Sequence, residues 1–103
     1  MSLFGLWSIK LESEIDFQFD LLEIDFYSMD VTIFNTAKIY SGKSSFELLN
    51  VDIENSSFRL SGYVHEPIFH EIQISGTLND GQIHGQISLD NASKVTFVGI
   101  KVN

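Results

Sequence analysis

Apolar and polar residues alternate along most of this chain, and that period of two constrains the fold more than any other feature. Trp7, Ile9 and Leu11 share one parity, and polar residues stand between them. Residues 15–21 repeat the pattern with phenylalanines at its centre. Successive side chains of a strand point to opposite faces of a sheet, so the alternation predicts half-buried strands.

The alternating segments are short and follow one another closely. Between Trp7 and Val102 they number eight or nine, and tight turns join most of them. Such a series predicts an all-β fold, an antiparallel up-and-down meander, and a meander of this size closes into a small barrel. Since 103 residues support one hydrophobic core, we expect residues 1–103 to form a single β-barrel domain.

The alternation is irregular in two places. At Leu21-Leu22 the parity changes, as a bulge or a tight bend requires, and Leu22, Ile24 and Phe26 then carry the apolar face. Residues 28–42 fit two interpretations, because a β-branched run inside them favours a strand while a serine at their start and a glycine at their end suit a helix. The sequence leaves both interpretations open.

Two dipeptides predict tight hairpin turns. They are Asn55-Ser56 and Asp80-Gly81, and the second suits the positive backbone angles of a type I′ turn. The cross-strand pairs that follow are Ile53 with Phe58, Val51 with Leu60 and Leu49 with Gly62 in the first hairpin, and Leu78 with Ile83, Gly76 with Gly85, Ile74 with Ile87 and Ile72 with Leu89 in the second.

Four glycines occupy the inward parity of four successive predicted strands. A loop over residues 90–94 opposes Leu89 to Val95, Ile87 to Phe97 and Gly85 to Gly99, and a longer loop through Pro67 opposes Gly62 to Gly76. In these registers all four glycines align across the sheet. A glycine inside a strand gives up packing, so the row predicts a sharp bend, a bulge or the floor of a cavity.

The charge of the chain limits its partners. Six basic and fourteen acidic residues give a net charge of −8, which repels phosphate backbones and anionic lipids and argues against nucleic-acid and membrane binding. The acidic residues of the segment Glu12–Asp30 have no basic residue among them, which suits a solvated strand face or a surface for a basic partner.

The chain has no cysteine, which excludes disulfides and thiolate chemistry. Its first ten residues lack the features of a signal peptide, and no apolar run is long enough to span a bilayer. We therefore expect a cytoplasmic protein.

Signs of catalysis or metal binding are few. His65, His70 and His84 do not share one predicted face, so they do not make a coordination shell. There is no Gly-x-Ser-x-Gly element and no glycine-rich phosphate loop, and we expect no catalytic residue, no metal and no cofactor. An enzyme is the least favoured hypothesis, with Tyr40, Tyr63 or His70 as its polar cavity groups.

Gly5-Leu6-Trp7 resembles the Gly-x-Trp signature of the lipocalins and the wider calycin group, and the last strand at residues 95–101 is similar to the same architecture. The resemblance implies an eight-stranded meander barrel in which the tryptophan closes one end and the interior can hold a small apolar ligand. Lipocalins usually place an arginine against that tryptophan. The only arginine here is Arg59, and Lys101 can substitute in part.

The leading hypothesis is a small-molecule binding protein that holds a hydrophobic ligand inside a lipocalin-like barrel. The predicted ligand-binding wall consists of Trp7, Phe17, Phe19, Phe58, Leu60, Ile74, Ile87 and Phe97. The alternative is a non-catalytic interaction module that uses the acidic segment, or a homodimer through the last strand. In that strand Val98, Ile100 and Val102 point outward unless a bulge reverses the parity.

Overall fold

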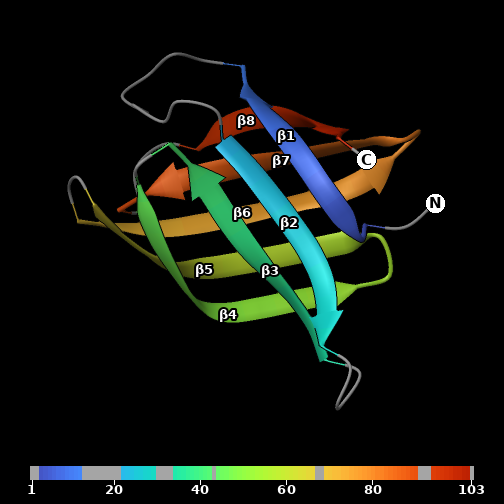
Figure 1. Ribbon diagram of the computed structural model, residues 1–103. Coiled ribbons are helices and arrows are strands. Elements are labelled where there is room, and N and C mark those ends of the chain that lie inside the picture. The colour runs from blue at the N-terminus through green and yellow to red at the C-terminus, as the bar shows by residue number, and fades with distance from the viewer. Residues whose placement is uncertain are drawn as a thin grey trace.

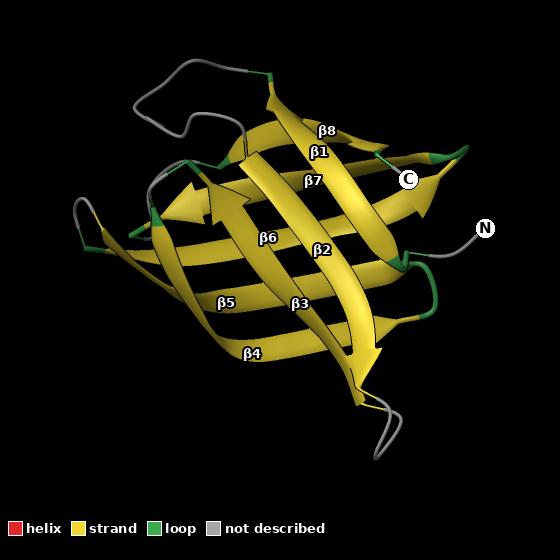
Figure 2. Ribbon diagram, in the orientation of Figure 1, coloured by secondary structure: helices red, strands yellow, loops and turns green. Residues whose placement is uncertain are grey.

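Eight antiparallel strands make up the regular structure of the protein (Figure 2). The computed structural model describes residues 3–12, 22–29, 34–42, 44–66, 69–90 and 94–102. The strands are β1 (Gly5–Leu11), β2 (Leu22–Met29), β3 (Phe34–Ser41), β4 (Ser45–Glu54), β5 (Ser57–Glu66), β6 (His70–Asn79), β7 (Gln82–Leu89) and β8 (Val95–Lys101).

The strands form one sheet in the order β3-β2-β1-β8-β7-β6-β5-β4. It curls until β3 and β4 come into contact, with β1–β3 crossing obliquely in front of β4–β8 (Figure 1). An isolated bridge between Ser41 and Ser44 joins β3 to β4 at their common corner, but no ladder connects the two strands. The predicted all-β meander is thus confirmed as a nearly closed barrel.

The inner face of the curled sheet forms the hydrophobic core. Trp7, Ile24, Leu60, Ile72 and Ile83 are all 0% exposed. Every strand except β4 contributes at least one buried residue to this core, whereas the inward residues of β4 are only half-buried. The core is therefore tightest on the wall opposite β4.

The predicted face assignments hold for the described residues except Leu49, which was predicted to face inward and is 57% exposed. Leu22, Ile24 and Phe26 are buried, as the parity change at Leu21-Leu22 predicted. Residues 15–21 lie outside the described part of the chain.

The open question at residues 28–42 is decided in favour of strands. β2 continues to Met29, and β3 pairs with it from Met29↔Phe34 to Leu22↔Ser41. Ala37 and Ile39 are buried while Lys38 between them is exposed, which is the alternation of a strand. The helix interpretation was wrong, because β3 pairs with β2 along its length and alternates between buried and exposed residues from Ala37 to Ser41. Residues 30–33 lie outside the described ranges.

Both predicted hairpin turns are confirmed. Asp80 and Gly81 have φ angles of 53° and 79°, as a type I′ turn requires, and Asn55 has a φ of 56°. The structure contains all four predicted pairs of the second hairpin and, in the first, Ile53↔Phe58 and Val51↔Leu60.

The predicted pair Leu49–Gly62 is wrong because β4 contains a bulge. Leu48 faces Gly62, Asn50 faces Ser61, and Leu49 between them has no partner and is 57% exposed. A Cβ atom on Gly62 would lie 2.0 Å from the carbonyl oxygen of Glu47. Glycine is therefore needed where the bulged backbone approaches β5.

The glycines do face inward, but the predicted row of four is wrong. Gly62 faces Ile72, and Gly99 faces Ile83 and Ile9. Gly76 and Gly85 face each other, flanked by Phe58 on β5 and Phe97 on β8. Val95 pairs with Ile87 instead of Leu89, which shifts β8 by two residues, so Phe97 faces Gly85 and not Ile87.

The glycine pair leaves room for two phenylalanine rings. A Cβ atom on Gly76 would lie 2.8 Å from the ring of Phe58, and one on Gly85 would lie 2.7 Å from the ring of Phe97. The rings cover glycine backbone that would otherwise leave a gap in the wall. Gly76 and Gly85 do not form the floor of a cavity inside the barrel, since Phe58 and Phe97 beside them are 4% and 2% exposed.

Candidate functional site

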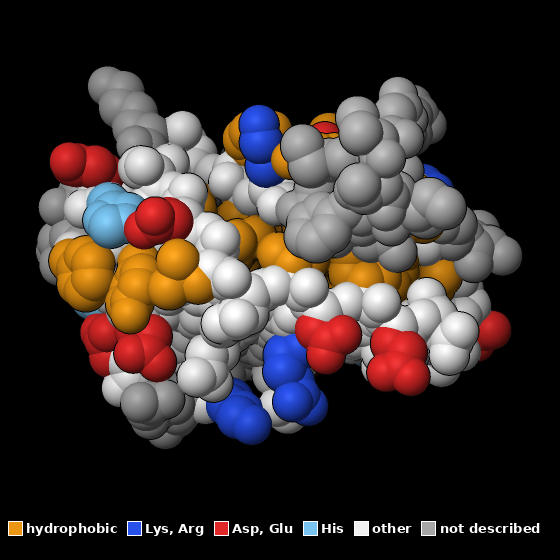
Figure 3. All heavy atoms as spheres, turned by 90° about the horizontal axis from the view of Figure 1, so that it is seen from below, with side chains coloured by type: hydrophobic (Ala, Val, Ile, Leu, Met, Phe, Trp, Pro, Cys, Tyr) orange, Lys and Arg blue, Asp and Glu red, His pale blue; other side chains and the backbone are white. Residues whose placement is uncertain are grey.

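An apolar cleft lies where β3 and β4 face each other without a ladder. Its volume is about 440 Å³. Figure 3, which views the molecule from below, shows a band of hydrophobic side chains in a furrow of the surface. The cleft is lined by Tyr27, Ala37, Lys38, Ile39, Tyr40, Ser44, Phe46, Leu48 and Val51.

The bulge in β4 determines which side chains of this strand face the cleft. Leu48 and Val51 are three residues apart and would point to opposite faces of a regular strand. With the extra residue Leu49 pointing outward, both instead pack against the core and are half-buried. Ala37 and Ile39 of β3 complete the apolar wall from the other side.

Polar groups form the rim of the cleft. Lys38 is exposed, Tyr40 is 46% exposed and Tyr27 is half-buried. Their ammonium and phenol groups can donate hydrogen bonds next to an apolar interior. Among the described residues that line the cleft there is no carboxylate and no imidazole. The arrangement suits the binding of an amphipathic molecule more than proton transfer.

The predicted ligand-binding wall lies on the inner face but is closely packed. Phe26 meets the ring of Phe58 edge-on, with 4.8 Å between ring centroids. Phe17 and Phe19 fall outside the described residues. The other six predicted residues are no more than 4% exposed: Trp7, Phe58, Leu60, Ile74, Ile87 and Phe97. Their contact with a ligand stays a prediction.

Sequence reasoning missed the cleft residues of β3 and β4. Phe46, Leu48 and Val51 are apolar positions of a recognised strand, and this was the signal on β4. Nothing local showed that β3 and β4 would fail to pair. The cleft follows from the curl of the whole sheet.

Trp7 lies on the inner face of β1, between Ile24 of β2 and Lys101 of β8. It is 0% exposed, and its indole Nε1 donates a 2.7 Å hydrogen bond to the carbonyl oxygen of Leu3. The Nζ atom of Lys101 lies 5.6 Å from the centroid of the Trp7 ring, a cation–π distance. Lys101 thus lies against Trp7, where the sequence suggested it as a partial substitute for the arginine.

Two of the three histidines contact carboxylates, each a different one. His65 Nε2 is 3.0 Å from Glu47 Oε1, and His70 Nδ1 is 2.6 Å from Asp90 Oδ2. The hydrogen bond from His70, with a second from the backbone N–H of Glu71, holds the pKa of Asp90 below its ordinary value. No group of three potential metal ligands occurs among the described residues.

The polar groups considered for an enzyme do not meet. Tyr63 stacks on Phe69 with 5.1 Å between ring centroids, and His70 pairs with Asp90. Tyr40 stands at the rim of the cleft.

The last strand has the predicted parity and no bulge. Val98 is half-buried, Ile100 is 55% exposed and Val102 is 42% exposed. β8 lies between β1 and β7 in the sheet, so it offers a partner a face and not a free edge. A homodimer through this face stays a prediction.

Comparison with known proteins supports the fold. The crystal structure of fatty-acid-binding protein 1 from Echinococcus granulosus matches with a TM-score of 0.57 and 11% identity, over 98% of each chain. A solved structure of the REP1-NXSQ fatty acid transporter matches with a TM-score of 0.52 and 15% identity, over 98% of this chain and 96% of that one. At such identities the likeness to fatty-acid-binding proteins shows the fold alone.

Sequence comparison adds no closer relative. No protein-family model matches the chain, and no curated protein matches it either.

The described residues include no helix of the length and apolarity needed to cross a membrane.

Proposed function

We propose that this protein binds a small hydrophobic ligand in its barrel and that the apolar part of the ligand lies in the β3–β4 cleft. The observation that carries the proposal is the incomplete burial of Phe46, Leu48 and Val51, which pack against the buried core and line the cleft. The two solved neighbours support it, since their names describe fatty-acid binding and fatty-acid transport.

The shape and the rim of the cleft favour a single apolar chain with a polar end. The chain would cover the side chains of Leu48 and Val51, and the polar end would reach Lys38 and Tyr40 at the rim. Each buried methylene contributes about 0.8 kcal/mol, so each added carbon should tighten binding about fourfold until the cleft is full.

The predicted ligand-binding wall forms the second part of the proposal. Trp7, Phe58, Leu60, Ile74, Ile87 and Phe97 lie behind the cleft and fill the interior. A ligand would touch them only after their side chains had moved aside, so we expect the cleft residues to contribute more to affinity.

Three finer predictions go with this proposal. They are lipocalin membership in the narrow sense, one domain over residues 1–103, and a cytoplasmic location. The Gly5-Leu6-Trp7 start and the Lys101 contact support the first.

Two adjacent leucines provide the test. Leu48→Trp should fill the cleft and weaken binding of a fluorescent fatty acid by about tenfold or more, because the larger side chain takes up the ligand's space. Leu49→Trp makes the same change on the outward side of the same strand and should leave affinity unchanged. Displacement by unlabelled fatty acids of increasing length gives the chain-length dependence.

Circular dichroism and thermal melting show whether each variant folds, and Leu48→Phe replaces Leu48→Trp if the larger side chain prevents folding. Full affinity in a folded Leu48 variant would place the ligand elsewhere. An absence of binding in the wild-type protein across fatty acids, retinoids and aromatic dyes would remove the proposal.

A further inference from the structure

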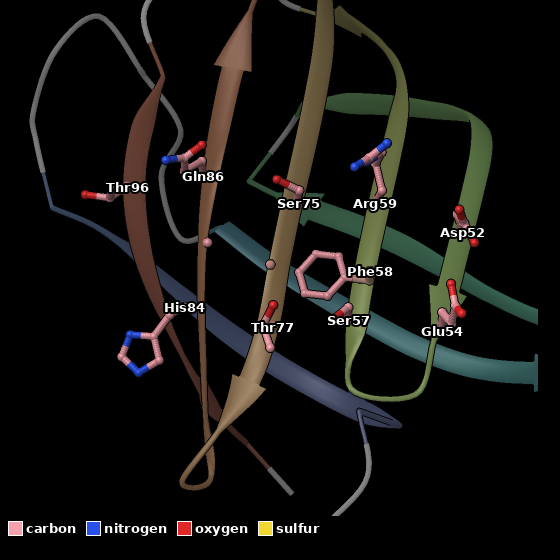
Figure 4. A pocket seen from close by; sticks show the side chains of 12 residues that line it. Asp52, Glu54, Ser57, Phe58, Arg59, Ser75, Thr77, His84, Gln86 and Thr96 are labelled. Carbon is pink, nitrogen blue, oxygen red and sulfur yellow. The ribbon is translucent and has the colours of Figure 1, made fainter.

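A second kind of hollow lies on the outer face of the sheet, away from the cleft. It has a volume of about 360 Å³ and is formed over β5, β6 and β7, with Lys94 at its margin. A larger, adjoining hollow of about 750 Å³ extends from it toward β4 and β8 (Figure 4). The two share Arg59, Ser75 and Gln86, so one molecule can occupy both.

The smaller hollow is positively charged on a strongly acidic chain. The chain has a net charge of −8 and six basic residues, of which Arg59 and Lys94 both line this hollow. Its described lining contains no aspartate or glutamate. Two cations facing one concave surface focus a positive potential there despite the overall charge.

Arg59 is available to a ligand. Asp52 stands opposite it in the β4–β5 register, but no ion pair joins them among the described residues. In Figure 4 the guanidinium of Arg59 lies between β5 and β6, and Asp52 stands on the other side of β5. The group therefore points toward the part of the surface that both hollows share.

Neutral donors surround the two cations. The hydroxyl groups of Ser61, Ser75 and Ser88 line the smaller hollow, together with the side-chain amides of Gln73 and Gln86. A guanidinium binds a phosphate through two parallel hydrogen bonds, an ammonium adds a point charge, and hydroxyl and amide groups donate to the remaining oxygens. This donor set matches a tetrahedral oxyanion.

The larger hollow carries negative charge on its β4 side, away from the part that it shares with the smaller hollow. Asp52 and Glu54 stand at its β4 side, and Ser57 and Thr77 of β5 and β6 line it with their hydroxyl groups (Figure 4). Carboxylates accept hydrogen bonds from alcohol groups and repel a second anion. This side of the groove therefore suits the hydroxylated, uncharged part of a ligand.

We propose that the outer groove binds a phosphorylated polyol, with the phosphate between Arg59 and Lys94 and the hydroxyl groups beside Asp52 and Glu54. The site is separate from the apolar cleft and does not depend on the proposed function. The same chemistry occurs in a soluble sugar phosphate and in the headgroup of a phosphoinositide lipid.

The test uses glucose 6-phosphate, inorganic phosphate and glucose at fixed ionic strength, with binding followed by backbone amide shifts in NMR. Glucose 6-phosphate should bind more tightly than inorganic phosphate, and glucose alone should not bind. Arg59→Gln or Lys94→Gln should each weaken binding about tenfold, because each removes charge-assisted hydrogen bonds. Lys10→Gln removes an exposed lysine of β1, outside the groove, and serves as the matched control.

Two further measurements separate the ligand's source and its orientation. Sedimentation with vesicles that contain phosphatidylinositol 4-phosphate tests binding of the lipid headgroup. The Asp52→Asn variant tests the orientation, and it should weaken the binding of glucose 6-phosphate more than the binding of inorganic phosphate. Equal affinity for both soluble ligands would overturn the assignment of the larger hollow. The whole proposal fails if neither glucose 6-phosphate nor the vesicles bind, or if binding survives in the Arg59 and Lys94 variants.

Discussion

Two pairs of strands that follow each other in the sequence differ in how they pair. β6 and β7 pair without a break from Ile72↔Leu89 to Asn79↔Gln82. β3 and β4 are also consecutive and share a bridge at Ser41↔Ser44, yet they separate beyond it and leave the apolar cleft.

The reason for the difference lies in the other neighbours of these strands. β3 follows β2 and β4 follows β5, and these two parts of the sheet cross obliquely (Figure 1). The two edges therefore meet at one corner only. The comparison shows that a short turn between two strands does not by itself produce a hairpin, and that unpaired edges can provide a binding surface.

The largest expected effect distinguishes the closed wall from the cleft. Leu60 is 0% exposed and Leu48 is half-buried, so the same truncation should have unequal costs. Leu60→Ala should lower the free energy of unfolding by about 4 kcal/mol, since it opens a cavity in packed core. Leu48→Ala should cost about 1 kcal/mol, because its site is already partly open. Urea unfolding measures both, and equal losses would refute the contrast.

The second-largest expected effect concerns the glycine pair of the β6–β7 hairpin, Gly76 and Gly85. A Cβ atom on Gly85 would lie 2.1 Å from the carbonyl oxygen of Ser75 and 2.7 Å from the ring of Phe97. Gly85→Ala should therefore lower the free energy of unfolding by about 3 kcal/mol through overpacking.

His84→Ala changes the exposed residue next to Gly85 and should stay within about 0.5 kcal/mol of the wild type. An unchanged unfolding midpoint in the Gly85 variant would mean that the two strands can move apart at little cost.

The smallest effect concerns the end of the same hairpin, where His70 of β6 binds Asp90 just after β7. The hydrogen bond from His70 lowers the pKa of Asp90 in the folded state from its ordinary value of 3.8. The unfolded chain therefore takes up this proton at a higher pH than the folded one. The pair stabilises the fold fully above pH 3.8, and the stabilisation disappears as the pH falls through the folded pKa.

The measurement is unfolding by urea at a series of pH values below 5 in the wild type, Asp90→Asn and His70→Gln. Both variants should lose stability less steeply than the wild type as the pH falls, because Asp90→Asn removes the shifted titration and His70→Gln removes the largest cause of the shift. If the free energy of unfolding of Asp90→Asn fell with pH as steeply as that of the wild type, the hydrogen bond would contribute nothing to stability in solution.

Much of the fold was available from local patterns. The alternation around Trp7, Ile24 and Leu60 placed each of these residues on the inner face, and Asp80-Gly81 fixed the whole β6–β7 register. Local reasoning failed where a register depended on a longer connection. The pairs Gly62–Gly76 and Gly85–Gly99 were wrong, because loop length alone does not determine how far the next strand slides.

The candidate binding sites were harder to predict than the fold. The sequence indicated an apolar interior, and the structure fills most of it with the rings of Trp7, Phe58 and Phe97. The accessible apolar surface lies instead on β3 and β4, where the bulge at Leu49 turns Leu48 and Val51 to the same side.

The sequence by itself determined which residues face inward and which tight turns join neighbouring strands, because both depend on the period of a strand and the backbone angles of a few residues. Only the tertiary structure decided that Gly76 and Gly85 lie under two phenylalanine rings, and that β3 and β4 stay apart. Those outcomes depend on the curl of the whole sheet, which brings together residues from strands that do not influence one another locally.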